Sequence, residues 1–427
     1  MKNKLVLQSL CLLSMAIGCN KNDDSVLPEI ELQNEPPLSF DLIDIADNST
    51  NVDMLPTLSW ESAKNPKGTN VTYDLYFGKE TNPTTVYQNG ITETSFQIND
   101  SLSLITDYYW KVVAKDTDGK ISQSPINTFT TRYYQIPDEP LFPWGFDPSL
   151  SHATTVFDNR IWVTGGYNGD VTGAVSSTSN GSIYTYHDSS GGFMGFGKRY
   201  FHQMLTYDNK IWVIGGRKLL GPSAIKKDVW SSEDGLVWNQ VTANASFGGK
   251  TSFGATVFDN KMWVIGGTDE NFDQTNDVWH SQNGANWTQV TAAANFSKRT
   301  GHAVITFKGK IWVIGGFDDS GRKNDVWFSS NGTVWTEATS EAAFPARNSH
   351  TATVFDNKIW IVGGITGESG DETNDVWYSD NGIDWEQVQV SDSFPPRAQH
   401  TAAVFNNQLW IIGGIGLETY KDIWTLN

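Results

Sequence analysis

Ile359-Trp360-Ile361-Val362-Gly363-Gly364 is the clearest copy of a phrase that recurs six times in the C-terminal part of this 427-residue chain. The other copies occupy 161–166, 211–216, 262–267, 311–316 and 409–414. Their glycine doublets recur every 48 to 51 residues. A repeat of this length predicts a stacked or radial array, because one such unit cannot bury its apolar faces alone.

Each copy contains four short apolar runs with turns between them. In the fifth copy the runs are 351–355, 358–362, 375–379 and 385–389. The second run is apolar at consecutive positions, so both of its faces must be buried, as in a sheet packed between two neighbours. Asn381-Gly382 between the last two runs predicts a hairpin with a type I′ turn, which needs positive φ at both central residues.

The glycine doublet, together with one Trp on the third run and one on the fourth, resembles the kelch repeat, and residues 133–427 resemble a kelch β-propeller. The sixth copy ends after its third run, so we predict six blades, with residues 133–137 supplying the outer strand of the last blade. The first copy is irregular. Residues 181–186 fit its third strand, and its outer strand is expected to be missing or distorted.

A second module precedes the array, in residues 37–132. Its alternating apolar pattern and regular turn spacing predict a β-sandwich of about seven strands. Pro56-x-Leu58-x-Trp60, with Leu102 six residues before Tyr108, resembles a fibronectin type III domain and its tyrosine corner. The expected fold class is therefore all-β, a six-bladed kelch-type propeller with an N-terminal fibronectin type III-like β-sandwich that acts as a spacer.

The N-terminus carries the pattern of an export signal. Residues 1–18 contain two Lys and then an apolar stretch too short to span a membrane. Ala16-Ile17-Gly18-Cys19 resembles a lipobox, in which the Cys is lipidated and becomes the mature N-terminus. Residues 19–36 are a predicted flexible tether, and 20–24 resemble the acidic export tether of Bacteroidetes surface lipoproteins. We expect a monomeric outer-membrane lipoprotein anchored by its lipid, exposed on the cell surface or, alternatively, facing the periplasm.

Charge and cysteine content exclude several functions. The formal net charge is −18, so nucleic acid is not an expected partner. The chain has two Cys, at positions 11 and 19, and both belong to the predicted signal and its cleavage site. No disulfide, Cys-bound metal or cofactor is therefore expected. Galactose oxidase also has kelch repeats, but its copper radical chemistry needs a Cys within the propeller, so that activity is excluded.

A cation precedes the first run in five of the six copies, three residues before a position that is usually His. In kelch domains that bind peptides, Arg at the matching positions reaches into a shared pocket. The resemblance implies a cationic ring suited to a carboxylate or sulfate. Its members would be Arg199, Lys250, Arg299, Arg347 and Arg397. The alternative is that each cation pairs with loop acids of a neighbouring blade.

Two other repeated residue types have a structural interpretation. The His positions are related by a pseudo-sixfold axis, too far apart to share a metal whose ligands lie about 2 Å from one centre. No metal site is expected, and each His is predicted to be hydrogen-bonded between blades. An Asp stands directly before the Val-Trp or Ile-Trp of the third run in five copies and is expected to cap the start of that strand. These residues are Asp228, Asp277, Asp325, Asp375 and Asp422.

The loops between the second and third runs differ most between copies and are the expected seat of specificity. They combine carboxylates with aromatic residues, a mixture that suits glycans and proteins equally. The predicted aromatic ligand contacts are Tyr167, Phe272, Phe317 and Tyr420. Our hypothesis is a non-catalytic lipoprotein that binds a glycan or protein on the propeller face. The alternative is an enzyme acting on an acidic sugar, because one bacterial kelch propeller family epimerises sialic acid.

Overall fold

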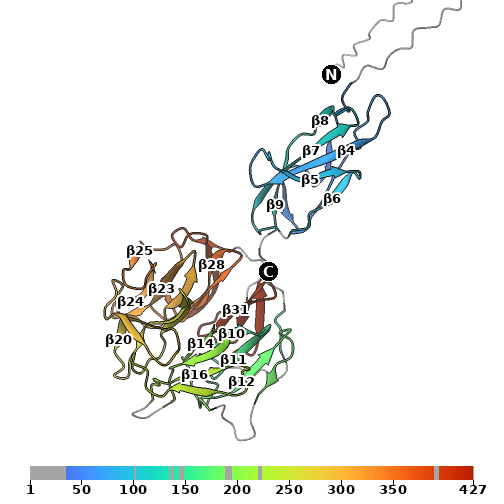
Figure 1. Ribbon diagram of the computed structural model, residues 1–427. Coiled ribbons are helices and arrows are strands. Elements are labelled where there is room, and N and C mark those ends of the chain that lie inside the picture. Colours follow the sequence, from blue (N-terminus) through green and yellow to red (C-terminus); the bar gives the residue numbers. More distant parts are fainter. Residues whose placement is uncertain are drawn as a thin grey trace, which may run out of the picture. The chain divides into compact units, whose positions relative to one another are not determined.

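The computed structural model describes residues 35–100, 102–132, 134, 136, 139–143, 149–187, 195–219, 224–388 and 394–426. Contacts divide the chain into two compact units, with the boundary between Thr131 and Arg132. The described residues form strands and no helix, so the predicted all-β class is confirmed. Figure 1 shows the N-terminal unit in blue and cyan and the C-terminal unit from green to red.

The N-terminal unit consists of two sheets that enclose one core. The first sheet has the order β1-β3-β6 and the second has the order β2-β9-β7-β4-β5, with β8 also paired to β7. The strands are β1 (Leu42–Asp44), β2 (Ser49–Val52), β3 (Thr57–Trp60), β4 (Val71–Gly78), β5 (Val86–Ile91), β6 (Ser95–Gln97), β7 (Asp107–Asp116), β8 (Ile121–Gln123) and β9 (Asn127–Thr131). Trp60, Leu75 and Trp110 are fully buried between them. This arrangement is consistent with the predicted fibronectin type III-like sandwich.

The C-terminal unit is a propeller whose blades are antiparallel sheets of strands a to d. Its strands are listed here blade by blade. Blade 1 has β10 (Ala153–Phe157), β11 (Arg160–Thr164), β12 (Val175–Thr178) and β13 (Thr185–Tyr186); blade 2 has β14 (Gln203–Tyr207), β15 (Lys210–Ile214), β16 (Val229–Ser232) and β17 (Asn239–Thr242); blade 3 has β18 (Gly254–Phe258), β19 (Lys261–Thr268), β20 (Gln274–Ser281) and β21 (Thr288–Thr291).

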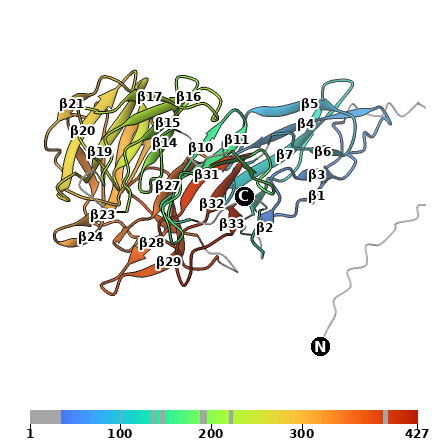
Figure 2. The same ribbon diagram turned by 90° about the horizontal axis from the view of Figure 1, so that it is seen from below.

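The remaining blades follow the same order. Blade 4 has β22 (Ala303–Phe307), β23 (Lys310–Asp318), β24 (Gly321–Ser329) and β25 (Thr336–Thr339); blade 5 has β27 (Thr351–Phe355), β28 (Lys358–Thr366), β29 (Asp371–Ser379) and β30 (Glu386–Gln387); blade 6 has β31 (Thr401–Phe405), β32 (Gln408–Ile412) and β33 (Ile423–Leu426). The short β26 (Arg347–Asn348) links blades 4 and 5. In Figure 2, β10, β14, β27 and β31 lie at the centre and β17, β21 and β29 lie outside.

The glycine doublet is required by the contact between neighbouring blades. In blade 5 both glycines have positive φ, 55° at Gly363 and 104° at Gly364. A Cβ at Gly363 would lie 3.0 Å from the His400 ring of the next blade, and one at Gly364 would lie 2.7 Å from His350 Cβ of its own blade. The doublet therefore leaves room for one ring on each side of strand b.

The c–d turns pack on the strand b Trp of the preceding blade. A Cβ at Gly382 would lie 2.2 Å from the Trp312 ring, so only glycine fits there. Asn381-Gly382 does connect two paired strands, as predicted, but the predicted type I′ geometry is wrong because only Gly382 has positive φ. Ser379 Oγ and Asn381 Oδ1 accept the turn's N–H groups instead. Both central residues have positive φ in the a–b turns, as at Asp356-Asn357.

Blade 1 corrects the predicted position of its third strand. Strand c is β12, and residues 181–186 form the turn and the outer strand β13. The turn at Asn180-Gly181 has the same hydrogen bonds to Thr178 as the other c–d turns have to Ser. Buried Tyr184 stands where the other blades have the outer Trp. The outer strand is therefore present but short.

The ring closes through residues that precede blade 1. The predicted closing residues 133–137 are described at 134 and 136, and the described pairing with β33 lies at Leu141, where the backbone exchanges two hydrogen bonds with Ile423. Tyr134 instead packs edge-on against Trp360 with ring centroids 4.3 Å apart. Tyr134 thus covers the strand b Trp of blade 5 at the position that a c–d turn covers in other blades.

Candidate functional site

The five cations that precede strand a are buried in ion pairs. Arg347 is fully buried, and its guanidinium donates to both carboxylate oxygens of Asp375 at 2.7 and 2.6 Å. It also donates to the backbone carbonyl of Gly363 at 2.8 Å. The same pairing recurs in Arg199–Asp228, Lys250–Asp277, Arg299–Asp325 and Arg397–Asp422. Each pair joins the segment before strand a to strand c of the same blade, with the Asp directly before strand c in blades 2 and 6 and within it in blades 3, 4 and 5.

The predicted cationic ring is therefore wrong as a ligand site. All five side chains are at most 1% exposed, and each charged end is already paired with an Asp carboxylate. The alternative of pairing with loop acids of a neighbouring blade is also wrong, because each partner is the Asp two residues before the strand c Trp of the same blade. The predicted capping position fits Asp228 and Asp422 and is wrong for the other three Asp residues, which lie within strand c. Asp375 also accepts a hydrogen bond from the Trp377 indole at 2.6 Å.

The electrostatics of these pairs are those of a structural clamp. Burial raises the pKa of Asp375, but the hydrogen bonds and charge of Arg347 outweigh it and hold that pKa below its usual value. Asp228 behaves in the same way beside Arg199. Both carboxylates stay ionised at neutral pH and hold their cations in place.

The repeated His residues are packed between blades. His152 Nε2 lies 2.8 Å from Thr401 Oγ1 of blade 6, and His400 Nε2 lies 3.1 Å from Thr351 Oγ1 of blade 5. His302 donates to the carbonyl of Ile265. His350 departs from this pattern, since neither ring nitrogen has a hydrogen-bond partner. His202 Nε2 lies 2.9 Å from Thr164 Oγ1 of blade 1, so the predicted hydrogen bonds between blades hold for four of the five His residues and not for His350.

Burial keeps these imidazoles neutral. It lowers the pKa of His152 to about 4 and that of His302 and His350 to about 3. His202 and His400 are shifted in the same direction. Within the described residues, no group of three or more His, Cys, Asp or Glu side chains could hold a metal ion.

The four predicted loop aromatics lie in different environments. Phe272 is 60% exposed and Phe317 is 36% exposed, whereas Tyr167 is half-buried. Tyr420 is buried against Arg397, whose guanidinium carbon lies 4.6 Å from the ring centroid. Tyr420 therefore packs on the buried Arg397–Asp422 ion pair of blade 6 and is not a surface contact.

Two of these aromatics belong to one cluster with residues that the sequence interpretation missed. The Tyr167 and Tyr200 rings are 6.0 Å apart, and Arg217 lies over Tyr200 at 5.2 Å and over Phe272 at 5.9 Å. We call Tyr167, Tyr200, Arg217 and Phe272 the aromatic–arginine cluster. It joins the b–c loops of blades 1, 2 and 3.

A repeated cross-strand pair explains how the cluster forms. Before strand a, five blades have the buried cation and blade 1 has Ser149. The residue that follows this position pairs with the residue that follows the glycine doublet, as in Leu150 with Tyr167 and Tyr200 with Arg217. The other blades place Thr251–Thr268, Thr300–Phe317, Asn348–Ile365 and Ala398–Ile415 there. Comparing these two positions across the six copies would have identified Tyr200 and Arg217, because blade 2 alone pairs an aromatic with a cation.

The cluster lies beside cations without acidic partners. Within the part of the chain that the structure describes, Arg217, Lys218 and Lys226 take part in no ion pair, although the chain carries a net charge of −18. Burial lowers the pKa of Lys226. Blade 2 therefore presents local positive charge on an acidic protein.

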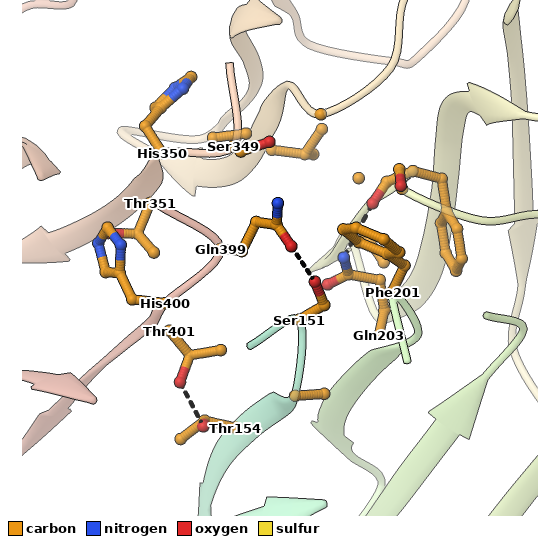
Figure 3. Close-up of a pocket in the computed structure, with 18 of the residues that line it drawn as sticks. Ser151, Thr154, Phe201, Gln203, Ser349, His350, Thr351, Gln399, His400 and Thr401 are labelled. Carbon is orange, nitrogen blue, oxygen red and sulfur yellow. Dashed lines mark hydrogen bonds between the residues drawn. The ribbon is translucent and has the colours of Figure 1, made fainter. Parts of the chain in front are cut away.

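A cavity of about 220 Å³ lies on the propeller axis and is lined by the starts of all six a strands. Six residues at its rim have positive φ and form a closed ring of backbone hydrogen bonds, each N–H donating to the carbonyl of the previous blade at 2.8 to 3.3 Å. They are Ser151, Phe201, Ser252, Gly301, Ser349 and Gln399. Figure 3 shows Gln399 and Phe201 beside the opening, with Ser151 bonded to Gln399.

This fold and these sites define a kelch-type propeller with a surface cluster and a neutral axial cavity. Residues 252–427 match the family model described as the KLHDC2/KLHL20/DRC7 Kelch-repeats domain. A kelch-repeat domain is therefore present in this chain, and such domains generally bind protein partners. No curated protein matches the chain.

The predicted lipid attachment at Cys19 lies outside the described residues, as does the whole predicted signal. Among the described residues, no helix has the length and apolar character needed to cross a bilayer.

Proposed function

We propose that this protein is a non-catalytic, lipid-anchored binding protein of the cell envelope whose propeller engages a protein partner through the aromatic–arginine cluster. The observation that carries the proposal is Phe272, an exposed aromatic side chain stacked against Arg217, which has no ion-pair partner within the described residues. Exposed aromatic and Arg side chains are the residue types most enriched where binding energy concentrates.

The backbone at Phe272 adopts a strained conformation. Its φ is 68°, a conformation that bulky residues rarely adopt. Asp269 maintains the turn by accepting the N–H groups of Asn271 and Asp273 on its carboxylate and that of Phe272 on its carbonyl. Strain that is maintained at an exposed aromatic residue supports a binding role.

The cations of the blade 2 b–c loop favour acidic residues in the partner segment on that side of the cluster, whereas Phe272 lies in a blade 3 loop that carries Asp269, Glu270 and Asp273. Arg217, Lys218 and Lys226 would meet the carboxylates of that segment, while Phe272 and Tyr200 would meet an apolar side chain. The overall negative charge of the protein would repel such a segment elsewhere, so it would be steered to blade 2.

A peptide library displayed on phage and selected on the purified protein tests this proposal. Enriched peptides should combine acidic and apolar residues, and their synthetic forms should bind at least about tenfold more weakly to Phe272→Ala and to Arg217→Ala. Val334→Ala is the matched control, since Val334 is 65% exposed on the c–d turn of blade 4. Equal affinity for wild type and both cluster variants, or no enrichment, contradicts the proposal.

The envelope location rests on the hydrophobic leader that ends in Gly18-Cys19. Cells fed a labelled fatty acid should label the wild-type protein and leave Cys19→Ala unlabelled. Protease added to intact cells should degrade a surface-exposed protein and spare a periplasm-facing one. Equal labelling of both forms contradicts the lipid anchor.

Catalysis on an acidic sugar, the second candidate, has less support. Such a reaction needs a charged group to hold the sugar carboxylate and an acid/base pair beside it. The described residues that line the axial cavity include no Asp, Glu, Lys or Arg. The observations therefore favour binding.

A further inference from the structure

We propose that the axial cavity is a second binding site, which takes one neutral sugar ring at the opening formed by Phe201 and Gln399. This goes beyond the protein-binding role proposed for the aromatic–arginine cluster. The cavity volume of about 220 Å³ exceeds what a single water needs and suits one small ring-shaped molecule.

The lining is polar without being charged. Hydroxyl and amide side chains from several blades line it, including Thr154, Gln203 and Thr401, and no ionised side chain is among the described lining residues. The imidazoles of His350 and His400 point away from the centre of the cavity (Figure 3). An ionised ligand would lose its water here without gaining a counter-charge, so the site selects against it.

One side of the opening breaks the sixfold pattern. At the rim position, four blades have Ser or Gly, whereas blade 2 has Phe201 and blade 6 has Gln399. Two positions further on, blade 2 has Gln203 where blades 1, 3 and 4 have Ala153, Gly254 and Ala303. Gln203 donates from Nε2 to the carbonyl of Phe253 at 2.8 Å and so has a structural contact. Small residues suffice to form the backbone ring elsewhere, so the ring itself does not require Phe201 or Gln399.

These side chains offer complementary contacts. Gln399 accepts a hydrogen bond from Ser151 through Oε1 at 2.6 Å, which orients the amide so that Nε2 points away from Ser151 and can donate to a ligand (Figure 3). Ser252 Oγ adds a hydroxyl at the same level. Phe201 provides an aromatic face, with its ring 5.0 Å from that of Tyr200. A pyranose presents an apolar C–H face to an aromatic ring and hydroxyls to amides, so it matches this set.

The test uses the full-length protein and methyl glycosides of glucose, galactose, mannose and N-acetylglucosamine. Glucuronate and glucosamine serve as charged counterparts of glucose. Saturation-transfer NMR and titration should show that at least one neutral glycoside binds, and that the charged sugars bind at least about tenfold more weakly. An oligosaccharide that ends in the bound sugar then distinguishes a free sugar from the end of a glycan.

Substitutions copied from the other blades locate the site. Phe201→Ser reproduces Ser151, Ser252 and Ser349, so the backbone ring should remain intact, and we expect binding to weaken by about three- to tenfold. Gln399→Ser should act similarly. Phe272→Ala should leave sugar binding unchanged, which separates this site from the protein-binding surface. The proposal is overturned if no neutral sugar binds, if charged sugars bind as well, or if both rim variants bind like the wild type.

Discussion

At the scale of single residues, the repeated Arg–Asp pair shows how closely a binding motif and a structural motif can resemble each other in sequence. Arg347 stands where a ligand-binding cation was expected, yet Asp375, 28 residues further on, satisfies both ends of its guanidinium. Only the fold brings the two together. A cation that recurs in five blades therefore indicates a structural role. A ligand would need one binding site, whereas the propeller needs the same contact in every blade.

Replacing Arg347 by Ala should destabilise the propeller strongly. The substitution leaves Asp375 buried beside Trp377 without its counter-charge, which costs about 3 to 5 kcal/mol. Arg347→Lys should cost less, because Lys250 forms the equivalent pair with Asp277 at 2.6 Å in blade 3. Thermal unfolding would show a lower melting temperature for Arg347→Ala than for Arg347→Lys. Peptide and sugar binding should persist in the folded variants. A melting temperature equal to that of the wild type would refute the clamp.

At the scale of the blade, the doublet, the strand b Trp and the c–d turn form one contact that repeats around the ring. Trp312 is held by its own indole bond to the carbonyl of Phe307 and is covered by Gly382 of the next blade. Trp360 of blade 5 is covered by Tyr134, with ring centroids 4.3 Å apart. The last interface thus depends on a residue outside the repeat.

Breaking this closure should weaken the propeller at one interface. Leu141→Pro removes the N–H that donates to the carbonyl of Ile423, and Tyr134→Ala exposes Trp360. Each variant should lower the melting temperature, and Leu141→Pro should aggregate more readily because strand β33 becomes an open edge. Light scattering during heating measures the second effect. Phe142→Ala is the control, since Phe142 is 70% exposed beside Leu141. Identical melting of all three variants would show that the ring closes elsewhere.

The features that repeat in every blade were predictable from the sequence, and the features found in one blade only were not. Blade number and strand order follow from the spacing of doublets and Trp residues. The displaced third strand of blade 1 was missed because Tyr184 replaces the Trp that marks the outer strand elsewhere. Closure at Leu141 was missed because a short segment outside the repeat carries no period. The aromatic–arginine cluster arises from three blades, and no single repeat contains its pattern.

At the scale of the whole molecule, the propeller places five His residues at the contacts between blades. They are His152, His202, His302, His350 and His400. Phe253 occupies the same place in blade 3, with its ring 3.1 Å from where a Gly215 Cβ would be. The contact therefore requires a planar ring of this size and does not require a charge. Protonating any of these His side chains would place an unpaired positive charge between two blades.

The propeller should consequently become less stable as the pH decreases. His350 has a folded pKa of about 3, below its usual value of 6.5, so the unfolded chain binds a proton first as the pH drops. Between pH 6.5 and 3 this His alone lowers the free energy of unfolding by about 1.4 kcal/mol per pH unit.

His350→Phe copies blade 3 and removes that proton uptake without changing the packing. Urea unfolding followed by Trp fluorescence between pH 7 and 4 should give the variant a shallower pH dependence, with equal or greater stability at pH 7, since neither nitrogen of His350 has a partner to lose. Phe253→His should steepen the dependence instead, and parallel curves for the wild type and both variants would show that these interfaces do not titrate.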